Sequence, residues 1–256
     1  LSLTDAGTSH DIPTSVLVDT IDSLSEMVDS LVDLPTNPPS LYIDLEGDNL
    51  SRHGTISILQ LHVLPSKQTY LLDVHTLKDQ CFSVTGRKGH SFGHFLESDA
   101  IPKVFFDVRN DSDALYHHFQ IKLGGIQDLQ LMELATRTFS RKCVNGLSKC
   151  IERDGSLSYT EGLAWRRVKD KGVKLFAPEH GGSYQVFNER PLSSDMIRYC
   201  VQDVQFLPLL WTRYKAKLTS VWWQRVLDAS KERVALSQSS AFVGKGRHMA
   251  LSPPGW

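Results

Sequence analysis

Residues 41–47 read LYIDLEG, a stretch in which two acids alternate with apolar residues. Its later residues alternate between apolar and polar, the pattern of a β-strand at 41–45 with one face against a core. Strand side chains point to opposite faces in turn, so Asp44 and Glu46 project from the same face. Adjacent carboxylates repel each other unless a proton or cation compensates them, and hard divalent cations prefer such oxygen ligands. An exposed strand edge explains the pair equally well.

Four more strand-like runs surround this strand. The runs at 55–63 and 69–74 follow it after short turns, which predicts three consecutive antiparallel strands. Residues 103–108 (KVFFDV) and 126–129 are the fourth and fifth strands, and helical spacing lies between and after them. We therefore expect an α/β fold with a mixed five-stranded sheet flanked by helices.

The remaining elements are mostly helical. Apolar residues recur at helical spacing from Ser23 onward, and 15–19 has the composition of a short edge strand. The stretch 144–190 is rich in Gly, Ser and basic residues and is either a long loop or a small helical insertion. Further helices are expected at 92–96, at 112–119 with Asp111 as its cap, at 194–210 with a kink at Pro208, and at 222–234, followed by an extended end at 244–256.

Composition bounds the class of protein. The chain has 256 residues, 41% of them hydrophobic and 22% charged, which is the balance of a globular protein and excludes disorder as its main state. No apolar run approaches the length of a membrane-spanning helix, so we expect no membrane partner. Four cysteines in a chain of this size do not suggest a disulfide framework, and we expect an intracellular location, nucleus or cytoplasm. The first residue is Leu1, so targeting signals cannot be read from this sequence.

Charge is distributed unevenly along the chain. The net charge is −1, yet residues 1–50 contain no Lys or Arg, while 137–174 and 211–256 are strongly basic. Such segments are either solvated faces or contacts for phosphate groups. The expected organisation is an acidic tail at 1–14, one domain at 15–215 with a basic insertion at about 144–190, and a C-terminal helix with an extended tail at 216–256.

Two later segments carry further polar groups of interest. Tyr199 and Asp203 are four residues apart in a predicted helix and so lie on one face, which is also a common surface pair. Asp107, Asp111 and Asp113 lie near a strand–helix junction, where one of them could complete a metal cluster with Asp44 and Glu46. Their position favours Asp111 or Asp113, which follow the strand, although aspartate is also common at helix N-termini for structural reasons.

Taken together, three segments of this sequence resemble the exonuclease motifs of a known superfamily. YIDLEG, KVFFDVRNDSDAL and NERPLSSDMIRYCVQDVQFLPLL are similar, in order and spacing, to the motifs of the tyrosine-containing (DEDDy) branch of the DEDD 3'-5' exonucleases. Within that branch the sequence resembles RNase D-like and Egalitarian-like exonuclease-domain proteins over roughly residues 15–215. The resemblance implies an RNase H-like fold and hydrolysis of phosphodiester bonds from the 3' end of single-stranded nucleic acid, RNA before DNA.

The resemblance also implies roles for particular residues. It assigns catalysis to Asp44, Glu46, Asp111, Tyr199 and Asp203. The four carboxylates would hold two Mg²⁺ or Mn²⁺ ions about 3.5–4 Å apart, as in two-metal hydrolases. Asp44 would bridge the ions, Glu46 and Asp203 would hold the ion on the water side, and Asp111 would help to hold the second. The phenol of Tyr199 would orient the attacking water, since tyrosine titrates near 10.

The sequence departs from RNase D in the basic insertion before residue 190. This insertion contains aromatic and basic side chains that suit single-strand binding, and we expect substrate contacts from Trp165, Arg166, Arg167, Lys169 and Lys171. An alternative function is a nucleic-acid-binding scaffold of the same fold, with dispensable catalysis, in an RNA-silencing or RNA-transport complex. The sequence does not identify a protein partner or an oligomeric state.

Overall fold

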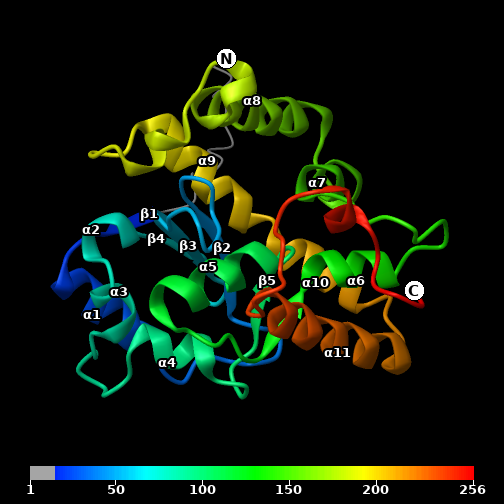
Figure 1. Ribbon diagram of the computed structural model, residues 1–256, viewed down its shortest axis with the longest axis horizontal. Helices are drawn as coiled ribbons and strands as arrows, with labels where there is room; N and C mark the ends of the chain where they lie inside the picture. The colour runs from blue at the N-terminus through cyan, green and yellow to red at the C-terminus, as the bar shows by residue number, and fades with distance from the viewer. Residues whose placement is uncertain (1–14) are drawn as a thin grey trace, which may run out of the picture.

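A computed structural model describes residues 15–256 of the chain (Figure 1). The acidic tail expected at 1–14 lies outside the described residues. The described part contains one mixed sheet with helices packed around it. None of its helices has the length and apolarity that a bilayer crossing requires.

The sheet has six strands rather than the five expected. The strands are β1 Ser15–Val18, β2 Leu41–Glu46, β3 Ile58–Val63, β4 Gln68–Leu72, β5 Lys103–Phe105 and β6 Ile126–Asp128, in the order β1-β4-β3-β2-β5-β6. β2, β3 and β4 form the predicted antiparallel run, and β5 and β6 add to it in parallel from the β2 side. The sixth strand is the short edge segment β1, which pairs in parallel along β4 from Ser15–Thr69 to Val18–Leu72 and so belongs to the same sheet.

Helices surround the sheet. They are α1 Ile21–Ser30, α2 Val74–Leu77, α3 Gln80–Ser83, α4 Phe92–Glu97, α5 Arg109–Phe119, α6 Leu129–Ala135, α7 Leu147–Asp154, α8 Tyr159–Phe176, α9 Ser194–Gln205, α10 Leu207–Lys215 and α11 Ser220–Ser237. In Figure 1, α1–α4 gather at one side of the molecule, α6, α10 and α11 at the other, and α8 lies beyond α9 at the top. Short 3₁₀ segments lie at 178–180, 184–188 and 247–250.

The alternation of side chains in β2 divides the interior into separate cores. Leu41, Ile43 and Leu45 pack into the hydrophobic cluster that contains α1 and α4, while Tyr42 packs into the cluster of α6, α10 and α11. Asp44 and Glu46 continue the Tyr42 face towards the end of the strand. The face bearing the two acids is therefore fixed by which residues of β2 are apolar.

Several element boundaries differ from those expected. The late helix is two helices, α9 and α10, that meet at Phe206, because Pro208 lies within the first turn of α10 rather than inside one continuous helix. Asp111 is not the N-cap of α5. The helix begins at Arg109, two residues before Asp111, its N-cap is Val108, and Asp111 lies in its first turn. The extended end expected at 244–256 contains a 3₁₀ turn at 247–250.

The basic insertion follows the helical alternative. Residues 144–190 contain α7 and α8, and both begin behind residues with extended backbone, Gly146 and Ser158. Ser158 and Glu161 form a capping box at the start of α8, with each side chain bonded to the other residue's backbone N–H. This local signal lies within a segment whose composition resembles a loop.

Candidate active site

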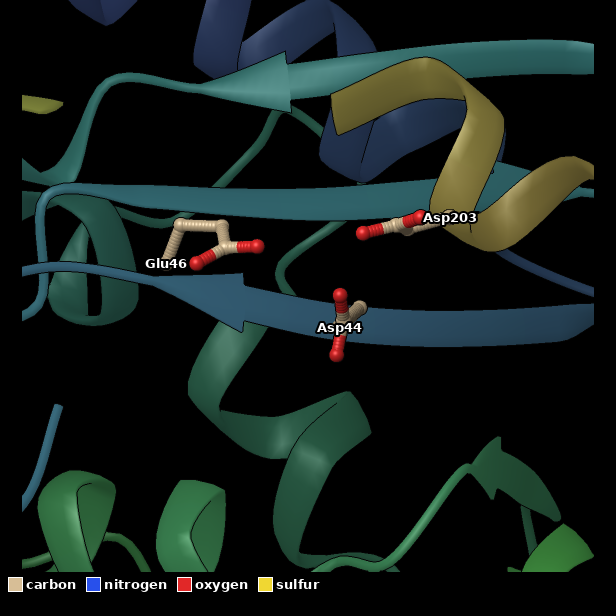
Figure 2. A group of neighbouring side chains, drawn as sticks. All are labelled: Asp44, Glu46 and Asp203. Carbon is tan, nitrogen blue, oxygen red and sulfur yellow. The ribbon is translucent and has the colours of Figure 1, made fainter. Parts of the chain in front are cut away.

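Three carboxylates from two elements converge at the end of β2. Oxygen atoms of Asp44, Glu46 and Asp203 all lie within 4.8 Å of one another. Figure 2 shows Asp44 and Glu46 rising from β2 and Asp203 from α9, with their carboxylate groups turned toward a common point. In the part of the chain that the structure describes, this is the one group of three or more metal-ligating side chains at such spacing.

The helix α9 brings Asp203 to this point by crossing the sheet. It packs against β2, β3 and β4 on the face from which Asp44 and Glu46 project. Tyr199 and Asp203 lie one helical turn apart, and both are 4% exposed. The predicted pairing of these residues with the strand acids is present in the structure.

Burial and mutual repulsion raise the pKa values of the strand acids. The pKa of Asp44 rises to about 7, first because burial disfavours its charged form and then because Asp203 lies beside it. The pKa of Glu46 rises well above its ordinary value for the same first reason, with Asp44 and Asp203 as further causes. Lys169 opposes both shifts. Without a compensating cation, this site holds ionised carboxylates only at a cost in free energy.

Asp111 lies beside this group, at the start of α5. Its side chain is buried, and its pKa is raised well above the ordinary value by burial and then by Asp44, Asp107 and Glu46. Its carboxylate is not part of the group that meets within 4.8 Å. The structure therefore places the fourth predicted ligand within electrostatic reach of Asp44 and Glu46, at the border of the cluster.

The other two aspartates of the junction are held by arginines. Asp113 accepts from the side chain and the backbone N–H of Arg52, both at 2.7 Å. Asp107 accepts a bidentate pair from Arg109, with the second bond at 2.6 Å, and also lies 3.4 Å from Arg233. Among the described residues, no Lys, Arg or His lies within ion-pair distance of Asp111. Asp111 is thus the junction aspartate whose charge remains available for a metal ion.

A basic side chain from α8 enters the acidic cluster. The Lys169 ammonium donates to both carboxylate oxygens of Asp203, each at 2.8 Å, and to the Tyr199 hydroxyl at 3.2 Å. It also lies 4.4 Å from the centroid of the Tyr199 ring. The acids Asp203, Glu46 and Asp44 together raise the pKa of Lys169, against the opposing effect of its burial, so it stays charged.

The Tyr199 hydroxyl stays protonated at neutral pH. Burial raises its pKa well above the ordinary value of 10, and Asp203, Glu46 and Asp44 raise it further. A phenol in this state can donate a hydrogen bond and accept another, but it does not remove a proton. This supports the expected positioning role over that of a base.

The donor set fits a hard divalent cation. All of the converging ligand atoms are carboxylate oxygens, which suit Mg²⁺ and Mn²⁺. Each acid is buried or half-buried, and the raised pKa values of Asp44, Glu46 and Asp111 express the need for positive charge at this point. The single ammonium of Lys169 supplies only part of it.

The residues of α8 that were expected to contact substrate differ in exposure. Trp165 is 6% exposed and belongs to the hydrophobic cluster that includes residues of α6, α10 and α11, which leaves little of its ring for stacking on a base; its contact with substrate stays a prediction. Lys169 faces the acids rather than solvent. Arg166, Arg167 and Lys171 are exposed and stay predictions.

The contact of Lys169 with the acids was not expected, although the sequence carries a signal for an inward-facing lysine. Trp165, Lys169, Gly172 and Phe176 follow each other at helical spacing and share one face of α8. A lysine in the middle of such a stripe requires an acidic partner when the stripe is buried. The capping box marks α8 as a helix, and the stripe then predicts an inward-facing ammonium.

Comparison with known proteins identifies an exonuclease family model and solved structures that resemble this chain. Residues 16–219 match a family model described as 3'-5' exonuclease. Trypanosoma brucei RNase D in complex with RNA U12 has a similar structure, with a TM-score of 0.74, 21% identity, and coverage of 94% of this chain and 76% of that one. No curated protein matches the chain in sequence.

Two further solved structures share the fold. The catalytic core of RRP6 from T. brucei has a TM-score of 0.62 at 17% identity, covering 88% of this chain and 53% of that one, so this chain spans about half its length. Brucella melitensis NrnC with bound Mg²⁺ has a TM-score of 0.56 at 17% identity, covering 91% of this chain and 98% of that one. At these identities the similarities confirm the α/β, RNase H-like exonuclease fold.

Asp44 makes the stability of the metal-free protein depend on pH. Its pKa is about 7 in the folded state against 3.8 ordinarily, so the folded state binds the proton more tightly. The stability that this contributes is complete below pH 3.8 and is lost as pH rises through 7. Asp44→Asn, which does not ionise, should therefore gain stability relative to wild type by about 3 kcal/mol between pH 5 and pH 8. Urea unfolding with a chelator present measures the difference.

A matched control is Asp228→Asn, at an exposed carboxylate on α11. The stability of the Asp228→Asn variant relative to wild type should stay constant between pH 5 and pH 8. A constant difference for Asp44→Asn as well would show that Asp44 titrates as an ordinary carboxyl group.

Proposed function

The chain belongs to the 3'-5' exonuclease family, and we propose that it removes nucleotides from the 3' end of single-stranded RNA with the help of two Mg²⁺ or Mn²⁺ ions. The observation that carries the proposal is the convergence of Asp44, Glu46 and Asp203, beside Asp111 and Tyr199, on one face of the sheet. Four buried or half-buried acids in one place have a chemical use in holding cations.

Each residue of the site has a defined task in this proposal. Asp44, Glu46, Asp111 and Asp203 hold the ions, which when bound supply an activated water and stabilise the charge on the leaving 3' oxygen. Tyr199 holds the water through its protonated hydroxyl. The N-terminus of α5, where Asp111 lies, is fixed by the arginine pairs of Asp107 and Asp113, which set the position of that carboxylate relative to β2.

RNA is the preferred substrate in this proposal because of the structural relatives. The T. brucei RNase D structure contains RNA, and the B. melitensis NrnC structure contains Mg²⁺. Both proteins share their fold with most of this chain. The scaffold alternative has no observation in its favour, because a protein that only binds has no use for four repelling acids.

Arg166 is the exposed basic residue of α8 best placed to contact substrate. It precedes Lys169 by three residues, so the two lie on neighbouring positions about 60° apart around the helix, whereas Arg167 and Lys171 lie about 160° from Lys169. Its side chain is 58% exposed and forms a 3.0 Å ion pair with Glu152. Exposed ion pairs contribute only about 0–1 kcal/mol, so a phosphate can replace Glu152 at little cost.

The position of Tyr199 depends on the absence of a side chain at Gly172. A Cβ atom at this residue would lie 2.6 Å from Tyr199 Cγ and 2.9 Å from its Cβ, closer than van der Waals contact allows. The Tyr199 ring also packs on Phe176, with centroids 5.2 Å apart. Close approach of α8 to α9 therefore sets where the Tyr199 hydroxyl lies.

The proposed activity can be tested with end-labelled oligonucleotides. Wild type in Mg²⁺ or Mn²⁺ should shorten 5'-labelled RNA stepwise and release labelled mononucleotide from 3'-labelled RNA. Asp44→Asn should lower the rate about a thousandfold, since metal ions contribute several kcal/mol of transition-state stabilisation. Asp228→Asn is the matched control and should cleave at the wild-type rate. Intact strands after incubation with wild type would reject the proposal, and a matched DNA series measures the preference for RNA.

Gly172→Ala tests the positioning of Tyr199. Alanine favours the helix by up to about 1 kcal/mol but collides with the Tyr199 ring, so kcat should fall at least about tenfold while α8 stays folded. Gly162→Ala, where a Cβ atom meets nothing within 4 Å, is the matched control. If both variants cleave RNA at the same rate, the close packing of α8 on Tyr199 has no catalytic role.

The contact of Arg166 can be measured by binding alone. In the Asp44→Asn background, which prevents cleavage, Arg166→Gln should weaken single-stranded RNA binding by roughly 1 kcal/mol, about fivefold. The slope of log Kd against log salt should fall by about 0.7, as expected for one lost phosphate contact. Lys174→Gln, on the same helix, should change neither quantity. Equal effects of the two substitutions, read by fluorescence anisotropy, would mean that α8 attracts RNA only through its total charge.

A further inference from the structure

Lys169 occupies a ligand that the proposed metal ions require. We propose that Lys169 is a built-in counter-ion which competes with the divalent cation for Asp203, so that metal binding at this carboxylate requires the ammonium to release it. The inference rests on the proposed function and deepens it, because it concerns how the same site controls its affinity for metal.

The contact geometry supports direct competition. The Lys169 Nζ atom lies 2.8 Å from both Asp203 oxygens, which places the positive charge between them. A metal ion bound to the same oxygens would be a few ångströms from the ammonium, in an interior where charge repulsion is strong. The two cations therefore exclude each other at Asp203.

The ammonium is held in place by more than its acid partner. Its side chain is only 20% exposed, and it rests against the Tyr199 ring while donating to the Tyr199 hydroxyl. The helix that carries it is anchored by Trp165, whose ring is buried and whose carbonyl accepts from Gln202 on α9 at 3.2 Å. Lys169 is thus presented to the acids by packed structure.

The charge balance explains what the counter-ion does. The carboxylates of Asp44, Glu46 and Asp203 meet within 4.8 Å, and Lys169 is the one lysine or arginine in the described chain that forms an ion pair with any of them. It relieves their repulsion when no metal is bound. The same positive charge opposes an incoming dication, so the site keeps its shape without metal at the expense of metal affinity.

Once it has released Asp203, the ammonium still has neighbours. The Tyr199 ring and hydroxyl lie within its reach, and part of the side chain faces solvent. Metal loading therefore moves Lys169 by a short distance and increases its exposure, while the helix that carries it stays docked. This change can be observed in the wild-type protein.

The first test measures metal affinity directly. Isothermal titration of Mn²⁺ into the full chain at pH 7.5 should give a Kd for Lys169→Met at least about tenfold lower than for wild type, a size typical of losing a competing hydrogen bond to a charged group. Lys174→Met removes one charge from the exposed side of the same helix and should leave the Kd within about twofold of wild type. Methionine keeps the length of the side chain without its charge.

The outcomes of this titration separate the two proposals. Tighter binding by Lys169→Met alone supports the inference. Equal or weaker binding by Lys169→Met, with wild type binding Mn²⁺, overturns the inference and leaves the proposed function standing. If none of the three proteins binds Mn²⁺, the proposed function fails and the inference fails with it.

A second test uses wild type and so does not depend on the folding of a variant. Lysines are acetylated briefly with an N-hydroxysuccinimide ester, with and without Mn²⁺, and the modified positions are quantified by mass spectrometry. Acetylation of Lys169 should increase severalfold when Mn²⁺ is added, while that of Lys174 should stay constant. Equal acetylation of Lys169 in both conditions would show that metal does not displace it and would overturn the inference.

Discussion

The carboxylates of Asp44, Glu46 and Asp203 repel one another, and the fold around them has to offset this repulsion. The fold places these groups within 4.8 Å of one another, and burial disfavours the charged forms of Asp44 and Glu46. A fold that brings them together must supply positive charge or accept their protonation. The Lys169 ammonium supplies one charge from within the chain, and an oxygen-rich site of this kind draws the remainder from divalent ions.

The layers of the fold make this concentration of charge tolerable. The apolar residues of β2 that alternate with the acids pack into the cluster of α1 and α4, so the strand is anchored independently of its polar face. On the other face, α9 buries Met196, Cys200 and Val204 as it crosses the sheet and so carries Tyr199 and Asp203 to the acids. Hydrophobic burial on both sides of β2 offsets the electrostatic cost between them.

Much of this could be predicted from the sequence, because it depends on local periodicity. The two-residue spacing of Asp44 and Glu46 and the four-residue spacing of Tyr199 and Asp203 fix their faces before any tertiary contact is known. The choice among Asp107, Asp111 and Asp113 could not be made from spacing. It depends on Arg52, 61 residues from Asp113, and on Arg233, 126 residues from Asp107, and no local pattern reports these two contacts. Only Arg109, the bidentate partner of Asp107, lies close in the sequence, two residues along the chain. The burial of Trp165 likewise depends on how α8 docks, which its composition does not show.

The basic insertion therefore contributes a side chain, Lys169, to the candidate site. Its composition suggests an arm that grips nucleic acid, yet the face of α8 that carries Trp165, Lys169 and Gly172 is directed inward. Gly172 permits the close approach of α8 to Tyr199, Trp165 anchors the helix in the core, and Lys169 then reaches Asp203. These contacts link the position of α8 to Asp203 and Tyr199, the groups that we propose bind metal and orient water. Displacement of α8 would free Asp203 and move Tyr199 together, so in the proposed mechanism metal loading and the placement of the water depend on the same helix.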